Sequence, residues 1–407
     1  MRSEALPLAD RAVAPDLARG AMLLLVALAN VHLYLYGRPL GVRLYPADPT
    51  GADRAVTLLQ MLLVDGRAYP LFGLLFGYGI GQLAARRAGA ADPPRSGVDA
   101  GSPTTALVQR RGLALVGIGV AHVALAWSGD VVAAYGLLAL LLAGLLVTGT
   151  AVSLLTTAVV GVLVETVLGA FSAAAPGGTA PLPSVAVGDP GAAVVARLAE
   201  WGRGTLVGSL VALAGAVAFG VWAARHRLLD GPAGEPPPGG TPGPAGDRGR
   251  GRALLARVAV AGVAAAVLGG APLALAAAGL WRPGAGALLL AGMLHTLGGF
   301  AGGLGYAAAF GLLGLRADGA RPGVVTRALA ACGQRSLSCY LGQSALFAAL
   351  LPAWTLGWGA RLGVAQAALL AVAVWSVLLL AAVASAGAGY RGPAEVVLRR
   401  LTYGARP

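Results

Sequence analysis

The sequence contains no lysine and has few charged, aromatic or cysteine residues. All 30 of its basic side chains are arginine, which excludes a lysine Schiff base or a lysine nucleophile. Charged residues make up only 12% of the chain, against 57% hydrophobic residues, and the mean hydropathy is +0.75. A chain of this composition cannot cover itself with a surface that water would solvate. We therefore interpret it as a membrane protein.

Cysteine is nearly absent, and no metal or phosphate motif is present. Cys332 and Cys339 are the only two cysteines, and we expect them to lie in one helix. Their Cα atoms would then be ~10 Å apart, too far for a disulfide. The sequence has no spacing typical of metal ligands, no phosphate-binding glycine loop and no Gly-x-Ser-x-Gly elbow.

Apolar runs of membrane-spanning length recur along the whole chain. A helix rises ~1.5 Å per residue, so a hydrocarbon core of ~30 Å requires about 20 apolar residues. Irregular backbone cannot face lipid, and the expected fold is therefore all-α, a polytopic transmembrane helix bundle with about ten spans. The expected spans are 17–36, 68–85, 111–128, 131–148, 150–171, 204–224, 256–280, 285–315, 336–352 and 364–387, with the eighth tilted, broken or partly interfacial.

Arginine alternates between the two sides of this arrangement. With a cytoplasmic N-terminus, 22 of the 30 arginines lie in cytoplasmic segments and 8 in outer segments. Cytoplasmic loops carry such an excess, so both termini are predicted to be cytoplasmic. The formal charge of +13 then reflects membrane orientation, and we expect no nucleic-acid partner.

A segment rich in proline and glycine divides the chain. Residues 228–252 have almost no apolar content and are predicted to form a disordered cytoplasmic linker. The predicted organisation is an N-terminal half at 1–227 with six spans, this linker, and a C-terminal half at 253–407 with four spans. Short helices are also expected at 56–64 and in the outer loop, at 194–201.

Polar side chains within the first apolar run are candidate functional residues, because each costs free energy without a partner. Asp16 and Arg19 are three residues apart and can pair at the cytoplasmic end. Asn30 follows Arg19 by eleven residues and falls on nearly the same helix face. His32 falls on the opposite face, and we interpret it as an interfacial histidine near Tyr34.

The third run begins with Arg110 and Arg111 and carries His122 toward its outer end, before a tight turn that contains Asp130. A histidine within two or three helical turns of a carboxylate could accept or relay a proton, and Tyr135 follows in the next span. The alternative is a histidine that only hydrogen-bonds within the bundle. His122 and Asp130 are the candidate catalytic pair.

The ninth run carries Tyr340, Gln343 and Ser344 at helical spacing, which predicts a polar stripe facing the bundle interior or a cavity. Interhelical hydrogen bonding alone would also explain it. Glycines at every fourth position of the second run predict a helix-contact face, at Gly73, Gly77 and Gly81. Asp65, Arg67, Glu165 and His295 are further ionisable residues without a motif; Asp65 and Arg67 could form a surface pair or the edge of a site.

Five blocks, in order, resemble the YeiB-like family of bacterial membrane proteins, domain-of-unknown-function family 418. They are spread from the first helix to the C-terminus, and the resemblance is weakest in the linker and the outer loop. The blocks are Asp16-Leu-Ala-Arg19-Gly20 with Asn30; Leu71-Phe72-Gly73 through Gly77-Tyr78-Gly79; Arg110-Arg111 with His122, Trp127, Gly129-Asp130 and Tyr135; Gly333-Gln334-Arg335-Ser336 through Tyr340 to Ser344; and Gly392-Pro393-Ala394-Glu395 with Arg399, Leu401, Thr402 and Tyr403.

This resemblance implies a multi-pass protein of the bacterial inner membrane with a ten-helix bundle. The family is distantly similar to membrane acyltransferases, which open with an Asp-x-x-Arg-Gly helix but have histidine where this chain has Asn30. It therefore implies possible acyl transfer from a cytosolic coenzyme A thioester to an acceptor in the cell envelope, with His122 as the base. The substrate-binding residues would be Asp16, Arg19, Asn30, Arg110, Arg111, Tyr135, Tyr340, Gln343 and Ser344. The alternatives are a transporter or flippase of small molecules or lipids, and a non-catalytic scaffold; membrane lipid is a partner in each.

Overall fold

The computed structural model describes residues 13–90, 102–173, 178–229, 245–317 and 323–404. Within these ranges the chain is a bundle of helices without a strand; one isolated bridge joins Leu40 and Pro46. The expected all-α fold is thus confirmed. The α-helices are α1 Val13–Val31, α2 Gly51–Leu63, α3 Ala68–Ala90, α4 Pro103–Leu125, α5 Val132–Leu141, α6 Ala143–Thr148, α7 Ala151–Ser172, α8 Pro183–Ala186, α9 Pro190–Glu200, α10 Leu206–Arg225, α11 Ala245–Ala277, α12 Ala285–Ala317, α13 Val324–Gln334, α14 Ser336–Leu350, α15 Val364–Gly387 and α16 Pro393–Tyr403.

Seven helical segments in the described ranges are long and apolar enough to cross a membrane. α5 and α14 are apolar but shorter, and the number of ten spans stays a prediction. The apolar helices α15 and α7 are poorly buried. The most apolar 18-residue stretch of α15 has a mean hydropathy of 2.6 and is 28% buried, and that of α7 has a mean hydropathy of 2.1 and is 17% buried. Apolar side chains that face outward in this way are suited to contact with lipid. The segments are Ala14–Tyr34, Gly51–Ala88, Ala151–Ser172, Pro190–Arg225, Gly251–Ala277, Ala285–Arg316 and Val364–Gly387.

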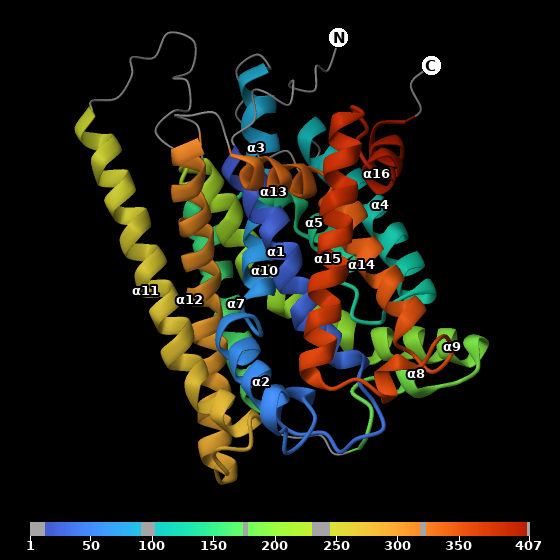
Figure 1. Ribbon diagram of the computed structural model, residues 1–407. Helices are drawn as coiled ribbons and strands as arrows, with labels where there is room; N and C mark the ends of the chain where they lie inside the picture. The colour runs from blue at the N-terminus through green and yellow to red at the C-terminus, as the bar shows by residue number, and fades with distance from the viewer. Residues whose placement is uncertain (1–12, 91–101, 174–177, 230–244, 318–322, 405–407) are drawn as a thin grey trace.

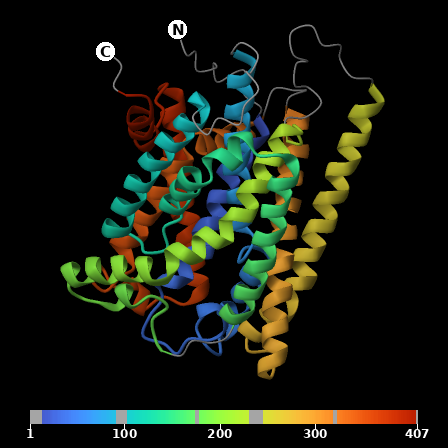
Figure 2. The ribbon, with the colours of Figure 1, turned by 180° about the vertical axis from the view of Figure 1, so that it is seen from behind.

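The bundle has two distinct ends (Figure 1). α13 and α16 lie at one end, which we call the α16 end, and α2, α8 and α9 lie at the other, which we call the α2 end. The reverse view shows α9 and α10 running on into each other across the back of the bundle (Figure 2). A π-helical turn at Trp201–Thr205 joins them. The α16 end is the one predicted to face the cytoplasm.

Local sequence explains where several helices begin. Ser102 accepts a hydrogen bond from the backbone N–H of Thr105 at 3.1 Å, and Pro103 follows it at the first position of α4. Asp189 and Pro190 begin α9 in the same way. These residues satisfy or remove the N–H groups that a helix start leaves without partners.

Glycine allows α3 and α10 to pack at very short distance, as the sequence predicts. A Cβ atom at Gly77 would collide with the backbone oxygen of Val217, and one at Gly73 would lie 2.9 Å from the Cβ of Ala216. On the facing helix, a Cβ at Gly220 would collide with the backbone of Leu74. The predicted contact face is confirmed, and it positions α3 beside the cavity described below.

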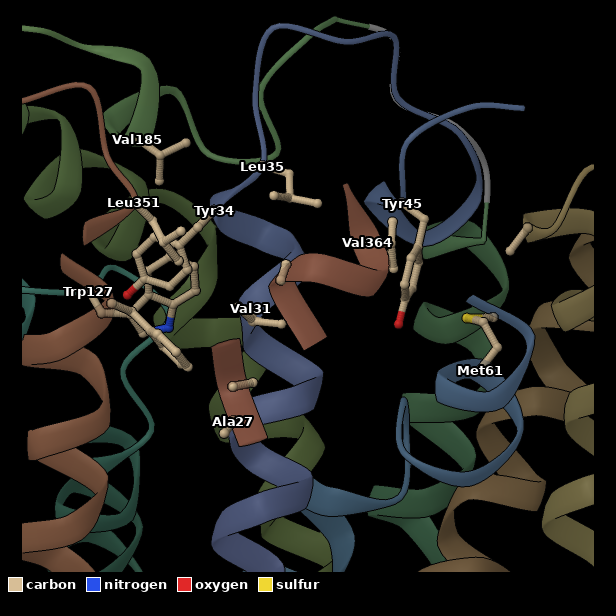
Figure 3. Packing of buried hydrophobic residues seen from close by; sticks show 14 of the residues in the cluster. Ala27, Val31, Tyr34, Leu35, Tyr45, Met61, Trp127, Val185, Leu351 and Val364 are labelled. Carbon is tan, nitrogen blue, oxygen red and sulfur yellow. The ribbon is translucent and has the colours of Figure 1, made fainter. Parts of the chain in front are cut away.

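The α2 end contains the largest buried apolar cluster (Figure 3). Tyr34 at the end of α1 stacks on Trp127, with 4.2 Å between the ring centroids. Both side chains are at most 2% exposed. The cluster fixes the turn after α1 against the turn after α4, and these two turns carry several of the candidate functional residues.

Two expectations about helix boundaries are wrong. The predicted span 131–148 is divided at Leu142 into α5 and α6. Cys332 and Cys339 do not share a helix, because Arg335 ends α13 and α14 begins at Ser336; their sulfur atoms are 3.7 Å apart as free thiols. The predicted span 285–315, in contrast, is one unbroken helix of 33 residues.

A residue far away in the sequence explains the break at Arg335. Glu395 in α16 accepts hydrogen bonds from the backbone N–H groups of Leu337 at 2.9 Å and Ser338 at 3.1 Å, at the start of α14. Arg335 itself donates to the carbonyl of Tyr390 at 3.0 Å. A carboxylate at a helix N-terminus stabilises it, so the fourth and fifth sequence blocks meet in space.

α11 begins at Ala245, so it includes the last residues of the predicted linker at 228–252. Residues 230–244 of that segment lie outside the described residues. The expected short helices correspond to α2 and α9.

We predict that Gly77→Ala destabilises the protein while Gly117→Ala does not. The new methyl group at position 77 has to displace α10, which costs about 1–3 kcal/mol. Gly117 in α4 has open space around it, and alanine there improves helix propensity by up to ~1 kcal/mol. Thermal unfolding in neutral detergent measures both; equal midpoints for the two variants would contradict the close packing of α3 on α10.

Candidate functional site

A cavity of about 290 Å³ lies within the bundle, toward the α2 end. Its apolar part comes from residues such as Val26, Leu33 and Phe72. Its polar part comes from side chains of α1, α3, α5, α7, α14 and the loop 35–50, which we call the strap. These polar residues are Asn30, His32, Arg43, Asp65, Tyr69, Tyr135, Ser172 and Tyr340.

His122 and Asp130 meet next to this cavity. His122 Nδ1 lies 2.8 Å from Asp130 Oδ1, and the side chains are 3% and 0% exposed. The other carboxylate oxygen accepts the backbone N–H of Ala133 at 2.7 Å, in the first turn of α5. Gly119 permits this contact, because a Cβ there would lie 2.6 Å from the Asp130 carboxylate. The predicted pair therefore has direct contact.

The pair leaves one nitrogen available. When Nδ1–H donates to the carboxylate, His122 Nε2 is an unprotonated acceptor, and it is buried without a hydrogen-bond partner among the described residues. The ring of Tyr340 lies 5.3 Å from that of His122, centroid to centroid. Tyr340 and Tyr135 line the cavity, and the buried hydroxyl of Tyr135 also has no partner there. Tyr340 therefore lies between the His–Asp pair and the cavity.

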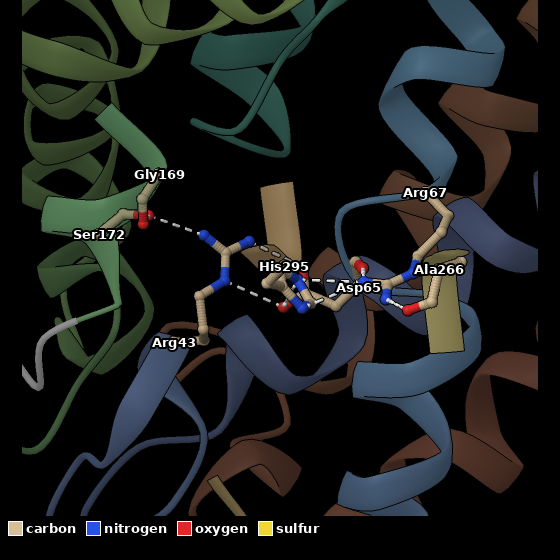
Figure 4. A network of polar contacts seen from close by, with 7 residues as sticks. All are labelled: Arg43, Asp65, Arg67, Gly169, Ser172, Ala266 and His295. Atoms are coloured by element: carbon tan, nitrogen blue, oxygen red, sulfur yellow. Dashed lines mark hydrogen bonds and ion pairs between the residues drawn. The ribbon is translucent and has the colours of Figure 1, made fainter. Parts of the chain in front are cut away.

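A network of charged residues forms the other side of the cavity (Figure 4). Arg43 binds Asp65 through two hydrogen bonds, Nε to Oδ2 at 3.0 Å and Nη2 to Oδ1 at 2.8 Å. Its remaining Nη1 donates to Ser172 Oγ at 2.9 Å. Arg67 is 0% exposed and donates to the carbonyl of Ala266 at 2.5 Å and toward the ring of His295 at 3.2 Å.

The strap holds Arg43 in an unusual backbone conformation. Arg43 has φ 55° and Leu44 has φ 64°, the left-handed region that side chains other than glycine rarely adopt. Stacking of His32 on Tyr45, with 3.9 Å between the centroids, holds this turn against α1. The adjacent Asp65 carboxylate raises the pKa of Arg43 further above its ordinary value, so the guanidinium is always charged.

A second polar group lies near the α16 end. Arg19 donates to Asp16 at 3.1 Å, as predicted, and to the backbone oxygen of Leu75 at 3.2 Å. Arg111 is partly buried and interacts electrostatically with Arg19 and Tyr403, whereas Arg110 is exposed. Asn30 lies on the cavity, and its side chain makes no hydrogen bond to the described part of the chain.

Apolar side chains separate the polar group near the α16 end from the polar residues of the cavity. Leu23 lies between Arg19 and Asn30 in α1, and Leu115 lies between Arg111 and His122 in α4. Both belong to one buried cluster, with Val26, Phe76 and Ile118 packed against it. The two arginines and the cavity are therefore separate in this conformation.

Gln343 and Ser344 lie in helix contacts. Gln343 Nε2 donates to the backbone oxygen of Leu23 at 3.0 Å and so links α14 to α1. The hydroxyl of Ser344 donates to the carbonyl of Tyr340 within its own helix, at 3.4 Å. Both side chains are buried and neither lines the cavity, so the structure places only Tyr340 of the predicted stripe on it.

The sequence alone did not identify all the cavity residues. His32, expected at the interface, is 3% exposed and lines the cavity. Arg43 and Ser172 gave no signal, since they reach the site through a strained loop and a helix end. The ionisable residues Asp65, Arg67 and His295 could have been grouped as buried charges in need of partners.

We predict that Asp65→Asn lowers the free energy of unfolding by about 2–4 kcal/mol, because it leaves Arg43 without its carboxylate partner. This is somewhat below the cost of breaking a fully buried pair, because the Arg43 side chain is 24% exposed. Asp48→Asn provides the matched control: the Asp48–Arg282 pair has 74% and 84% exposed side chains and contributes less than about 0.5 kcal/mol. Denaturant titration in mixed micelles measures both, and equal losses would contradict the buried network.

Comparison with known proteins agrees with the sequence resemblance. Residues 246–405 match the model of a family described as "Protein of unknown function (DUF418)". This range contains α12 to α16 and nearly all of α11. No curated protein and no solved structure matches the chain.

Proposed function

We propose that this chain, whose residues 246–405 match the DUF418 family model, is a membrane-embedded acyltransferase. It transfers an acyl group from a cytosolic thioester to a hydroxyl acceptor bound in the cavity near the α2 end. The contact between His122 and Asp130 carries this proposal.

The His–Asp pair is suited to act as a general base. Asp130 orients the imidazole and stabilises the imidazolium that forms, and the start of α5 stabilises the carboxylate in turn. Nε2 is then the basic atom, buried beside Tyr340. Exclusion of water from such a site favours transfer to the acceptor over hydrolysis.

The proposed step balances without any further reactant. His122 Nε2 takes the proton of the acceptor hydroxyl as its oxygen attacks the thioester carbonyl. A C–O bond forms, the C–S bond breaks, and the imidazolium returns its proton to the departing thiolate. The products are an ester and a free thiol.

Arginine supports the approach of the donor from the α16 end. Arg19, Arg110 and Arg111 place positive charge where an anionic thioester such as coenzyme A would arrive. The apolar cluster containing Leu23 and Leu115 has to move for an acyl chain to reach His122. While this cluster separates the donor side from His122, water in the cavity cannot hydrolyse the thioester.

We predict that His122→Ala abolishes transfer without unfolding the protein. Membrane vesicles containing the protein receive a radiolabelled acyl-coenzyme A, and label in lipid or envelope material is followed with time. Loss of the base is expected to reduce incorporation by about 10²–10⁴-fold, and Asp130→Asn by a smaller factor. His226→Ala is the matched control, because this exposed histidine at the end of α10 only contacts Trp222.

Two outcomes contradict acyl transfer: no thioester supports labelling above vesicles without the protein, or His122→Ala retains the wild-type rate. Solute movement that depends on an ion gradient, with no covalent labelling, would favour the transporter. A phenotype that survives substitution of both His122 and Tyr340 would favour the scaffold.

A further inference from the structure

Several polar groups on the cavity have no protein partner. His32 is 3% exposed, lines the cavity, and its Nδ1 has no hydrogen bond among the described residues. The hydroxyl of Tyr135, which is 2% exposed, also has no partner there, whereas the hydroxyl of Tyr340, 3% exposed, lies near the backbone of Val131. The amide of Asn30 also has no partner in the described part of the chain. Buried polar groups in folded proteins are almost always hydrogen-bonded. Other buried groups, such as Thr57 Oγ1 and Trp127 Nε1, also lack a partner, so the grouping of these side chains around one cavity is what points to a polar ligand.

Positive charge is concentrated on one side of the same cavity. Arg43 is paired with the Asp65 carboxylate, whereas Arg67 donates to the backbone carbonyl of Asp65 and interacts with its carboxylate only electrostatically. The next acidic residue, Glu165 in α7, is hydrogen-bonded to Tyr69 and lies within electrostatic range of Arg43. Each oxygen of Asp65 accepts one guanidinium hydrogen bond from Arg43, which neutralises the carboxylate charge. Asp65 therefore offers little repulsion to a further anion at the free edge of Arg43.

The free edge of Arg43 is Nη1. It contacts only the hydroxyl of Ser172, a neutral acceptor that donates its own hydrogen to the carbonyl of Gly169 at 3.0 Å. A hydrogen bond from guanidinium to an oxyanion is roughly twice as strong as one to a neutral oxygen. An oxyanion can therefore displace Ser172 as the acceptor, and Ser172 can rotate to donate to it.

We propose that Arg43 Nη1, Ser172 and Asn30 form an oxyanion site, and that the ligand of this cavity is a phosphate or carboxylate attached to an apolar chain. The apolar residues Val26, Leu33 and Phe72 line the same cavity and surround that chain. This proposal rests on the proposed function only where it identifies the ligand with the acceptor of acyl transfer. Binding of the ligand can be measured without any acyl transfer.

The strap supports this assignment. Arg43 and Leu44 both line the cavity and both have positive φ. Such conformations persist only where the surroundings enforce them, and they cluster at ligand sites. Here the His32–Tyr45 stack and the hydrogen bond from Gly41 N to Tyr45 O, at 2.7 Å, enforce the turn. The strain presents the guanidinium to the cavity.

The test measures binding to the purified full chain in neutral detergent by isothermal titration calorimetry. Decyl phosphate is the probe; decanol lacks the charge, and inorganic phosphate lacks the chain. We expect decyl phosphate to bind at least about tenfold more tightly than either. If inorganic phosphate binds as tightly as decyl phosphate, the site binds a free anion, and the proposal that its ligand carries an apolar chain is overturned.

Variants identify the residues that bind the oxyanion. Arg43→Gln is expected to weaken the binding of decyl phosphate by at least about tenfold. Ser172→Ala and Asn30→Ala leave the Arg43–Asp65 pair intact, so they test the site even if Arg43→Gln does not fold. Each is expected to weaken the binding of decyl phosphate about threefold to tenfold. Arg282→Gln, an exposed arginine on the same end, is the matched control and should change nothing.

Equal affinity for decyl phosphate and decanol would overturn the proposal, as would unchanged affinity in both Ser172→Ala and Asn30→Ala. His122→Ala separates this site from the proposed reaction. If that variant loses transfer and keeps decyl phosphate affinity, both proposals stand. If no thioester is used by the wild type but binding still requires Ser172 and Asn30, acyl transfer fails and the oxyanion site remains.

Discussion

The structure depends on one constraint: a polar group within a hydrocarbon environment must find its partner inside the protein. Gln343 donates to the backbone of α1, and Gln60 in α2 donates to the carbonyl of Leu28 at 3.1 Å. Arg67 has no exposed surface and binds three elements of the bundle. Glycine makes such contacts possible, because only helices without intervening side chains approach closely enough.

Several of the buried polar groups without a hydrogen-bond partner in the described residues lie around the cavity. His122 Nε2, His32 Nδ1 and the hydroxyl of Tyr135 are buried without partners, and all lie on or beside the cavity. Gln60 Oε1, Gln343 Oε1 and Arg67 Nε also lack a partner in the described part of the chain, so the cavity groups are distinguished by surrounding one space. The His–Asp pair supplies a base and Arg43 supplies a fixed positive charge, on different sides of one space.

The all-α fold was largely predictable, because the length of an apolar run is a local property of the sequence. The helix break at Arg335 was not, since its cause is Glu395, far away in the chain. The approach of His122 to Asp130 could be expected from the short turn between α4 and α5. The position of Arg43 at the site could not be predicted, because a strained loop brings this residue to Asp65. Neither the positive φ angles nor the closure of that loop leaves a pattern in the sequence.

The central claim is that the bundle spans a membrane with its α16 end in the cytoplasm, so that the strap and the cavity lie toward the outside. Single cysteines at two exposed positions test it directly: Thr50→Cys at the end of the strap and Val324→Cys in α13, in a background with Cys332 and Cys339 replaced by serine. A membrane-impermeant maleimide should label position 50 in intact cells and position 324 only after the membrane is opened. The reverse pattern, or equal labelling of both positions in intact cells, would contradict the claim.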